Sequence, residues 1–358
     1  MAVTSKKIFI AGGGTGGHIY PGLAIAQAIK KEDPSCEVHF VGTKHGLENK
    51  IIPQNNFKLH LIDIGGLKNT SFLKKIFVFL KFPLAFLQCV SLLLKYRPAF
   101  VFGVGGYSSG PFVLTASLMG FKTALFESNA APGITNRILS RFVQTSFTLF
   151  EESRQYLKSK KVLIYGFPVR GSMAPSPARK DSGLKVLIFG GSQGARGINM
   201  TVSQAINKYP QELKEIEFVH QTGKLDFPSY KDFYKERPNV KCLEYLDPIK
   251  DYYDWADLVV CRAGASTLSE LSACGKAAIL VPFPFAADNH QQKNAESLVR
   301  KNAARMCLQK DFTPELFMKL VLEFKNNRDE IAALENNIKS LYIPNAATNI
   351  AKDILFCE

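Results

Sequence analysis

The segment Lys7-Ile-Phe-Ile-Ala-Gly-Gly-Gly-Thr-Gly-Gly17 points to the architecture, because a short apolar run passes directly into a glycine-rich turn. The helical pattern Leu23-Ala-Ile-Ala-Gln-Ala-Ile29 follows it. The same unit recurs at Lys185-Val-Leu-Ile-Phe-Gly-Gly-Ser-Gln-Gly194, which precedes Met200-Thr-Val-Ser-Gln-Ala-Ile206. A buried strand, a glycine turn and a helix open a parallel α/β domain. The sequence therefore predicts an α/β protein with two Rossmann-like, doubly wound parallel-sheet domains.

Working outward from these two units gives the domain boundaries. The chain has 358 residues, enough for about two domains of roughly 100–200 residues each. The polar, proline-containing stretch Ser172–Gly183 is interpreted as the linker. We predict an N-terminal domain over residues 1–168 and a C-terminal domain over 169–344, with a helix in 345–358 returning to the first domain. The further expected strands are Glu37–Val41, Phe100–Val104, Ala124–Phe126, Glu217–His220, Asp257–Cys261 and Ala277–Val281.

The composition limits the classes of partner. Lys and Arg number 45 against 31 Asp and Glu, a net charge of +14 that favours nucleic acid, an anionic membrane surface or a phosphorylated substrate. No helix-turn-helix or RNA-binding module is recognisable, so we expect no nucleic acid. The seven cysteines form no C-x-x-C pair, and the N-terminus lacks the apolar core of a signal peptide. Both features favour a cytoplasmic protein.

The stretch Phe72–Arg97 is very apolar but is interrupted by lysines. Its uncharged run, Phe82–Leu94, is shorter than the roughly 20 residues that span a bilayer, and we expect Pro83 to break a continuous helix. Lysine beside phenylalanine and leucine is typical of a segment in the headgroup interface. The alternative is a helix whose apolar face is core and whose lysines are solvated. The predicted membrane contacts are Phe72, Lys74, Lys75, Phe77, Phe79 and Lys81.

The first glycine loop, Gly12–Gly17, fits the dinucleotide pattern G-x-G-x-x-G. A nicotinamide site also needs an acid at the end of the second strand, where this chain has Gly42-Thr43-Lys44. We therefore disfavour a dehydrogenase and expect a loop of exposed amides that takes an anion or sugar hydroxyls. His18 follows at a helix N-terminus, which disfavours imidazolium. It is either a general base or a residue that caps the turn.

Three further motifs lie in the second half. Gly190–Gly194 lacks the Gly-Lys-[Ser/Thr] of a Walker loop but suits phosphate or sugar oxygens. In the turn Cys261–Glu270, Arg262 and free amides could face a pyrophosphate, although Thr267–Glu270 also matches a purely structural capping box. Asp288–Gln292 suits a hydroxyl-rich ligand. No Asp-x-Asp and no metal-ligand spacing occurs, so we expect no metal.

Together these motifs closely resemble the MurG family of GT-B N-acetylglucosaminyltransferases, over nearly the whole chain. The matching segments are Gly13–Leu23, Gly103–Pro111, Glu127–Asn129 with Gly133 and Asn136, Pro168–Arg170, Gly190–Arg196, His220–Gly223, Trp255–Asp257, Cys261–Glu270 and Asp288–Gln291. The resemblance implies two domains facing across a cleft. It also implies inverting, metal-independent transfer of GlcNAc, without a cofactor, from UDP-GlcNAc to the MurNAc 4-hydroxyl of undecaprenyl-pyrophosphoryl-MurNAc-pentapeptide (lipid I), which gives lipid II for peptidoglycan.

The resemblance also implies partners and a location. The partners would be UDP-GlcNAc, lipid I with its pyrophosphate in the first domain's glycine loops, an anionic membrane surface and other cell-wall synthesis proteins. The enzyme would lie peripherally on the cytoplasmic face of the cell membrane.

The family's site residues carry over by matching position. His18 or Glu127 would be catalytic, and Gly14, Tyr107 and Ser108 would lie near the acceptor. Glu270 would accept the ribose hydroxyls, Leu246 would meet the uracil and Gln291 a GlcNAc hydroxyl. The full donor set would be Thr15, Gly16, Gly17, Asn129, Arg170, Ser192, Leu246, Ala265, Ser266, Thr267, Leu268, Ser269, Glu270 and Gln291.

The chain departs from the family pattern at three positions. Phe126 and Ser128 stand in a His-Glu-Gln-Asn motif, and Phe167 stands in a Gly-Asn-Pro-Val-Arg motif. These changes concern the acceptor contacts and the surroundings of Asn129. Two alternatives remain at this point: a related GT-B transferase with another acceptor, and a non-catalytic module that binds a nucleotide sugar or membrane.

Overall fold

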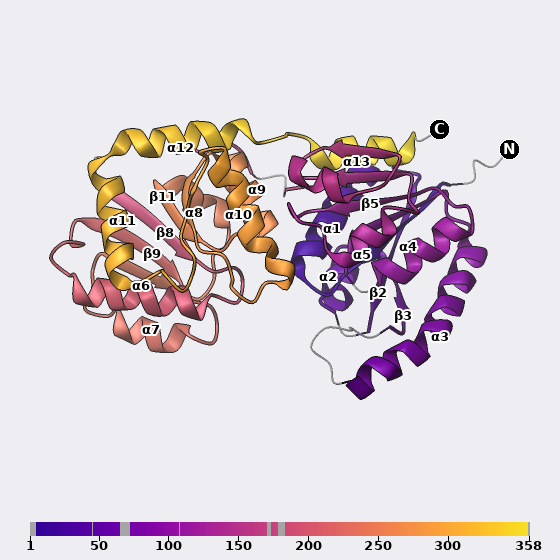
Figure 1. Ribbon diagram of the computed structural model, residues 1–358, viewed down its shortest axis with the longest axis horizontal. Coiled ribbons are helices and arrows are strands. Elements are labelled where there is room, and N and C mark those ends of the chain that lie inside the picture. The colour runs from indigo at the N-terminus through magenta and orange to yellow at the C-terminus, as the bar shows by residue number, and fades with distance from the viewer. Residues whose placement is uncertain are drawn as a thin grey trace. The chain divides into compact units, whose positions relative to one another are not determined.

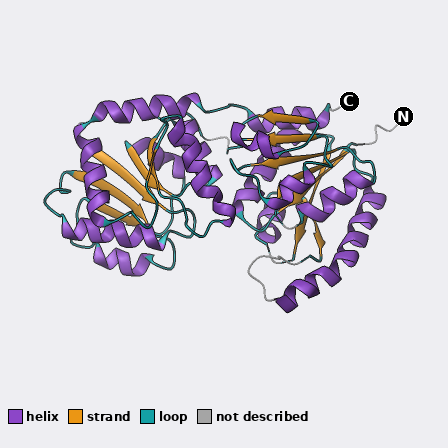
Figure 2. Ribbon diagram, in the orientation of Figure 1, coloured by secondary structure: helices purple, strands orange, loops and turns teal. Residues whose placement is uncertain are grey.

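The computed structural model of the protein describes residues 5–44, 46–64, 72–106, 108–169, 173–177 and 183–356, with side chains in the helix 72–96 described from Pro83 onward. The chain divides into two compact units. Unit 1 comprises Met1–Val169 and Ile343–Glu358, and unit 2 comprises Arg170–Tyr342. Both contain a parallel sheet between helices (Figures 1 and 2), which confirms the predicted fold class. Half of the expected linker, residues 172 and 178–182, lies outside the described residues.

The sheet of unit 1 has the strand order β3-β2-β1-β4-β5-β6-β7, with every pair parallel. The order reverses between β1 and β4. Strands β2 and β3 lie on one side of β1, and β4 to β7 lie on the other side. Its strands are β1 (Lys7–Gly12), β2 (Glu37–Thr43), β3 (Lys58–Ile62), β4 (Phe100–Gly105), β5 (Thr123–Glu127), β6 (Thr145–Thr148) and β7 (Lys161–Ile164).

Helices cover both faces of this sheet. The core on one face contains Phe9, Phe112 and Leu125 and receives the buried side chains of α3, α4 and α5. The C-terminal helix α13 packs on α1, so the end of the chain returns to unit 1 (Figure 1). The helices are α1 (Gly16–Glu32), α2 (Glu48–Gln54), α3 (Phe72–Tyr96), α4 (Ser109–Leu118), α5 (Ile134–Leu139), the 3₁₀ helix η1 (Glu151–Tyr156) and α13 (Ala346–Leu355).

Helix α3 corrects one expectation, because Pro83 does not end it. A proline removes one backbone hydrogen bond and can bend a helix without stopping it. Beyond Pro83, Ala85, Cys89 and Leu93 are fully buried, which holds this half of α3 to the unit. Within the described residues, no helix combines the length and the hydropathy that crossing a membrane requires.

The sheet of unit 2 has the order β10-β9-β8-β11-β12-β13 and is also parallel. Its order reverses between β8 and β11. The strands are β8 (Leu184–Phe189), β9 (Ile216–Gln221), β10 (Val240–Leu243), β11 (Leu258–Cys261), β12 (Ala277–Leu280) and β13 (Arg305–Met306).

Alternate residues of β8 show how unit 2 is packed. Leu184, Val186 and Ile188 pack in one core with buried side chains of α6 and α11. Helix α8 contacts both β8 and α9. The helices are α6 (Arg196–Lys208), α7 (Phe227–Phe233), α8 (Ile249–Trp255), α9 (Ala265–Cys274), the 3₁₀ helix η2 (Ala287–Asn289), α10 (His290–Arg300), α11 (Pro314–Asn326) and α12 (Arg328–Ser340).

Candidate functional site

Several predicted site residues, among them His18, Ser192 and Glu270, follow the carboxyl ends of the strands where the order of each sheet reverses. In unit 1 these are the loops after β1 and β4, and in unit 2 those after β8 and β11. Ligands of open α/β sheets bind outside the carboxyl ends of the strands, at the point where the strand order reverses. Each unit therefore carries its own candidate site.

In unit 1 the loops after β1 and β4 contact each other directly. The amide of Gly13 donates to the carbonyl of Gly105 at 3.3 Å. Gly105 and Gly106 have φ values of +94° and +87°, a region that favours glycine. A Cβ on Gly106 would also overlap the backbone of Gly13. The glycines therefore let two backbones approach more closely than side chains would allow.

His18, in the first turn of α1, points its ring back toward these loops. Nδ1 lies 3.3 Å from the carbonyl oxygen of Gly13, and a Cβ on Gly105 would lie 3.0 Å from Nε2. A carbonyl only accepts hydrogen bonds, so Nδ1 must carry the hydrogen in this contact. In the neutral ring the lone pair is then on Nε2. This contact leaves Nε2 as the nitrogen of the neutral ring that can accept a proton.

The loop is not the row of exposed amides that the sequence predicts. The amide of Gly14 donates to the Glu48 carboxylate at 2.7 Å. Glu48 begins α2 and is 1% exposed. Sequence reasoning looked for an acid directly at the end of β2 and missed this one, which stands five residues after Thr43. The expectation is wrong at Gly14 because the chain itself supplies the anion.

Glu127, at the end of β5, is buried and organises the loop that carries Asn129. One carboxylate oxygen accepts from the amide and side chain of Asn129 at 2.9 and 3.1 Å, and the other accepts from Asn136 at 2.8 Å. Burial raises the pKa of Glu127, and these hydrogen bonds oppose that rise. Both carboxylate oxygens of Glu127 therefore already accept hydrogen bonds from asparagine side chains of the same unit.

Other predicted residues of unit 1 have mixed positions. Thr15 and Gly17 are exposed and Gly16 is partly exposed, as a ligand-binding loop requires. Ser108 is buried, and its hydroxyl donates to the carbonyl of Val41 at 3.1 Å, so this side chain is used within the unit. Tyr107 and Arg170 lie outside the described residues.

In unit 2 the loop after β8 rests on the loop after β9. Gly194 and Gly223 have φ values of +76° and +84°, and a Cβ on either would overlap the other loop's backbone. Ser192 lies exposed at the tip of the β8 loop. As in unit 1, glycines thus allow two loops to approach closely at the carboxyl ends of neighbouring strands.

Helix α9 begins at Ala265, so Thr267–Glu270 is not a capping box. Its N-cap is Gly264, which places Thr267 in the first turn and Glu270 in the second. The first amides of a helix have no carbonyl partner within it, and the helix dipole makes this end favourable for phosphate. Ala265, Leu268 and Ser269 are buried, whereas Ser266, Thr267 and Glu270 are partly exposed.

Glu270 is held by a neighbour that sequence reasoning missed. The hydroxyl of Tyr253, from α8, donates to Glu270 Oε2 at 3.1 Å. Tyr253 is fully buried, and burial raises its pKa well above the usual value. A neutral phenol is a hydrogen-bond donor, so Tyr253 fixes one oxygen of Glu270.

Arg262 corrects an expectation, because it does not face a ligand. Its guanidinium donates to the carbonyls of Val281 and Pro282 at 3.0 and 3.1 Å and also to Gln309. Burial lowers its pKa to about 10. Arg262 therefore joins the end of β11 to the residues after β12.

The remaining donor residues lie on two further loops. The Gln291 side chain is partly exposed and accepts from the amide of Phe283 at 3.0 Å, which ties α10 to the loop after β12. Leu246 is buried in the loop after β10.

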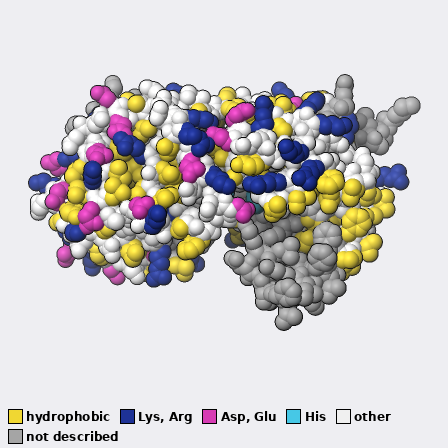
Figure 3. Space-filling view, viewed as in Figure 1, with side chains coloured by type: hydrophobic (Ala, Val, Ile, Leu, Met, Phe, Trp, Pro, Cys, Tyr) yellow, Lys and Arg dark blue, Asp and Glu magenta, His cyan; other side chains and the backbone are white. Residues whose placement is uncertain are grey.

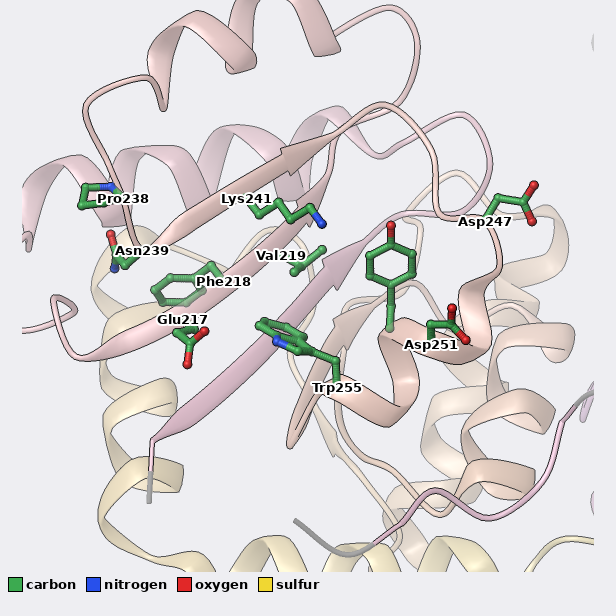
Figure 4. Close-up of a pocket in the computed structure, with 10 residues that line it drawn as sticks. Glu217, Phe218, Val219, Pro238, Asn239, Lys241, Asp247, Asp251 and Trp255 are labelled. Atoms are coloured by element: carbon green, nitrogen blue, oxygen red, sulfur yellow. The ribbon is translucent and has the colours of Figure 1, made fainter. Parts of the chain in front are cut away.

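A cavity of about 400 Å³ lies outside this set of residues, beside β9, β10 and α8 (Figure 4). Lys241 and Trp255 are among the residues that line it, as are Glu217 and Asp251. None of the predicted donor residues lines this cavity. Among the described residues no group of three or more His, Cys, Asp or Glu could hold a metal ion.

Comparison with known proteins agrees with both units. The N-terminal domain of glycosyltransferase family 28 matches residues 8–148, and the C-terminal domain of that family matches residues 185–354.

The chain is similar to two curated proteins named UDP-N-acetylglucosamine–N-acetylmuramyl-(pentapeptide) pyrophosphoryl-undecaprenol N-acetylglucosamine transferase. The one from Bdellovibrio bacteriovorus is 50% identical, with 98% of this chain and 99% of that protein covered. The one from Myxococcus xanthus is 41% identical, with 96% and 91% covered. The crystal structure of Acinetobacter baumannii MurG is similar at 30% identity and a TM-score of 0.79, covering 98% of this chain and 99% of that one.

Proposed function

This chain belongs to glycosyltransferase family 28, and we propose from that membership that it transfers GlcNAc from UDP-GlcNAc to the MurNAc 4-hydroxyl of lipid I, forming lipid II. The relatives that share its whole length are named for this reaction. The observation that carries the proposal is the orientation of His18, whose Nδ1 faces the Gly13 carbonyl and whose Nε2 is the basic nitrogen. An enzyme that activates a hydroxyl needs a base in that state.

The donor binds through residues of unit 2 in this proposal. The first turn of α9 and the Ser192 loop hold the diphosphate, and Glu270 accepts the ribose hydroxyls. Leu246 meets the uracil through its backbone, and Gln291 binds a hydroxyl of GlcNAc. The resemblance to the family adds Thr15, Gly16, Gly17, Asn129 and Arg170 to the donor set. Backbone amides stand in for the cation that other transferases use.

The chemical step follows from these assignments. The acceptor O4 attacks C1 of GlcNAc, the O4 proton moves to His18 Nε2, and the bond from C1 to the β-phosphate oxygen breaks. The configuration at C1 inverts because attack and departure occur on opposite faces. The departing UDP gains negative charge, and fixed amide donors at the start of α9 stabilise that charge more in the transition state than before it.

Unit 1 also carries a surface suited to an anionic membrane. Exposed apolar side chains of α3, α4, α5 and the turn after α5 include Leu84, Leu87, Leu94, Leu118, Ile134, Ile138 and Phe142. Helix α4 contacts both α3 and α5. Figure 3 shows hydrophobic side chains gathered beside Lys and Arg over this part of unit 1. Between Asp63 and Glu151 the only acid is the buried Glu127.

We therefore place the protein peripherally on the cytoplasmic face of the cell membrane, with unit 1 toward the lipid. Apolar side chains bordered by cations bind the headgroup region without spanning it. The earlier predicted contacts Phe72, Lys74, Lys75, Phe77, Phe79 and Lys81 continue the same helix, but their side chains lie outside the described part.

The experiment is incubation of the purified protein with labelled UDP-GlcNAc and a lipid I analogue. We expect label in the lipid product, with the β-linkage that inversion gives, and the same rate in the presence of a chelator. Transfer to another lipid or polysaccharide but not to lipid I would select a related transferase. Binding of UDP-GlcNAc with no transfer to any acceptor would select a non-catalytic module.

A further inference from the structure

Glu48 is a buried carboxylate that no part of the proposed reaction uses. Oε2 accepts from the amide of Gly14 at 2.7 Å, and Oε1 accepts from the amide and the hydroxyl of Thr43 at 3.0 and 3.1 Å. A buried carboxylate is tolerated only where donors replace its water. These three donors come from the ends of β1 and β2, so the carboxylate joins the glycine loop to the neighbouring strand.

Glycines enclose this carboxylate. A Cβ on Gly13 or on Gly46 would overlap its oxygens, and a Cβ on Gly42 would lie 2.6 Å from Cγ. None of these three has a positive φ, so close approach to Glu48 is the reason each must be glycine. The loop is therefore built around an anion that belongs to the chain.

The contact of Glu48 reaches His18 through a single peptide group. The Gly14 N–H that Glu48 accepts from and the Gly13 C=O that His18 Nδ1 faces are the two ends of the Gly13–Gly14 peptide. This group is planar, so fixing its N–H fixes its C=O. An anion at the N–H also polarises the group and makes the carbonyl a stronger acceptor.

We propose that Glu48 is a positioning residue, which acts through the Gly13–Gly14 peptide to hold His18 with its hydrogen on Nδ1 and its lone pair on Nε2. The inference rests on the proposed function for the role of His18 as base. It also means that the acceptor's pyrophosphate does not bind at the Gly14 amide, because Glu48 already fills that position.

Glu48→Gln is the sharpest test. A glutamine carbonyl oxygen can satisfy the two donors of Thr43, but its NH₂ group then faces the Gly14 N–H, and the link to His18 is lost. We expect kcat to fall by roughly tenfold to a hundredfold, part of the roughly 10²–10⁴-fold that a general base supplies. We expect the Kd for UDP-GlcNAc to change by less than about twofold, since binding does not need the proton transfer.

The matched control is Asn49→Ala, the next residue of α2. Asn49 donates to the carbonyls of Thr43 and Gly46 at 2.8 and 3.0 Å, so its loss loosens the same loop without touching Glu48 or Gly14. We expect kcat to stay near the wild-type value. An equal loss of kcat in both variants would overturn the proposal, because it would show that loop rigidity alone matters.

Nitrogen NMR of the ¹⁵N-histidine-labelled free protein gives a readout that needs no substrate, with His18→Gln to assign the signal. In the wild-type protein at neutral pH we expect the hydrogen of the neutral His18 ring on Nδ1. In Glu48→Gln we expect a larger fraction of the tautomer that carries the hydrogen on Nε2. A wild-type ring with its hydrogen on Nε2 would overturn the proposal even if Glu48→Gln did not fold. Wild-type protein that transfers no GlcNAc would instead remove the proposed function and leave this tautomer result standing.

Discussion

The ring of Phe126 meets the ring of Phe167 edge to face, with 5.8 Å between their centroids. Both side chains are buried in unit 1. They are also two of the positions at which this chain departs from the motifs of the family, where histidine and asparagine are usual. These two departures therefore form one contact, in which an apolar aromatic pair replaces the two polar side chains of the family motifs.

This contact predicts that the two positions are coupled. Phe126→His and Phe167→Asn should each destabilise the protein, because each leaves a buried polar group facing an aromatic ring. The double variant should lose less free energy of unfolding than the sum of the two single losses, by roughly 0.5–3 kcal/mol. Urea denaturation followed by circular dichroism measures this.

Phe126→His combined with Phe57→Leu is the control pair. Phe57 packs on Phe40 and precedes β3, four strands from β5 in the sheet order, so these two changes should be additive. Additivity in the test pair as well would mean that the ring contact does not link the two positions.

His18→Ala should remove the proton acceptor without removing the donor site. We expect kcat to fall by about 10²–10⁴-fold, the usual worth of a general base. Calorimetric titration with UDP-GlcNAc should give a nearly unchanged Kd. Activity close to that of the wild-type protein would assign the proton to another group, and Glu127→Gln would then be the next variant to measure.

Tyr253→Phe should weaken donor binding, because it removes the hydroxyl that donates to Glu270 Oε2 at 3.1 Å. One such hydrogen bond is worth about 1 kcal/mol, so the KM for UDP-GlcNAc should rise about fivefold with little change in kcat. Tyr252→Phe, on the same helix, is the control and should leave KM unchanged. If both variants behave like the wild-type protein, Glu270 does not depend on Tyr253 for its ribose contact.

Acid should destabilise unit 1 through a pair of histidines, of which His39 is buried and His60 is partly buried. His39 Nδ1 lies 2.9 Å from His60 Nε2. Burial lowers the pKa of both rings, that of His60 to about 4, and the two rings repel each other when charged. The unfolded chain binds these protons near pH 6.5, so the folded state binds fewer, and the free energy of unfolding should fall as pH drops from about 6.5 to about 4.

His60→Gln tests this assignment, since it removes one titrating ring. Urea denaturation at pH 7 and at pH 5 should show a smaller pH dependence in His60→Gln than in the wild-type protein. Since His220 in unit 2 also has a lowered pKa, of about 3, the variant should retain part of the dependence. An identical pH dependence in both proteins would exclude the His39–His60 pair as a source.

Leu84→Ser combined with Leu87→Ser should reduce sedimentation with anionic vesicles. These side chains are 51% and 62% exposed, so the change removes surface apolar area and leaves the core intact. Leu225→Ser is the control, because Leu225 is 88% exposed but belongs to unit 2. Equal sedimentation of the wild-type protein and the double variant would place the membrane contact elsewhere, and Phe77, Phe79 and Lys81 would be replaced next.

The sequence by itself determined the architecture. Two runs of apolar residues are each followed by a glycine turn and a helical pattern. These patterns involve only residues that are close together in the chain, so they can be recognised in a single sequence. For that reason the two parallel-sheet domains could be predicted, as could the strand ends at which His18, Ser192 and Glu270 would lie. The family followed from an ordered set of such motifs.

Only the tertiary structure decided which groups are paired. Glu48 meets Gly14 across 34 residues, Tyr253 meets Glu270 from another helix, and Arg262 turns to two carbonyls instead of a phosphate. Sequence spacing does not reveal such contacts, because strand order and helix packing bring together residues that are distant in the chain. The same reason explains why Pro83 sits inside a helix whose second half is anchored by buried side chains, where local propensity alone predicts an end.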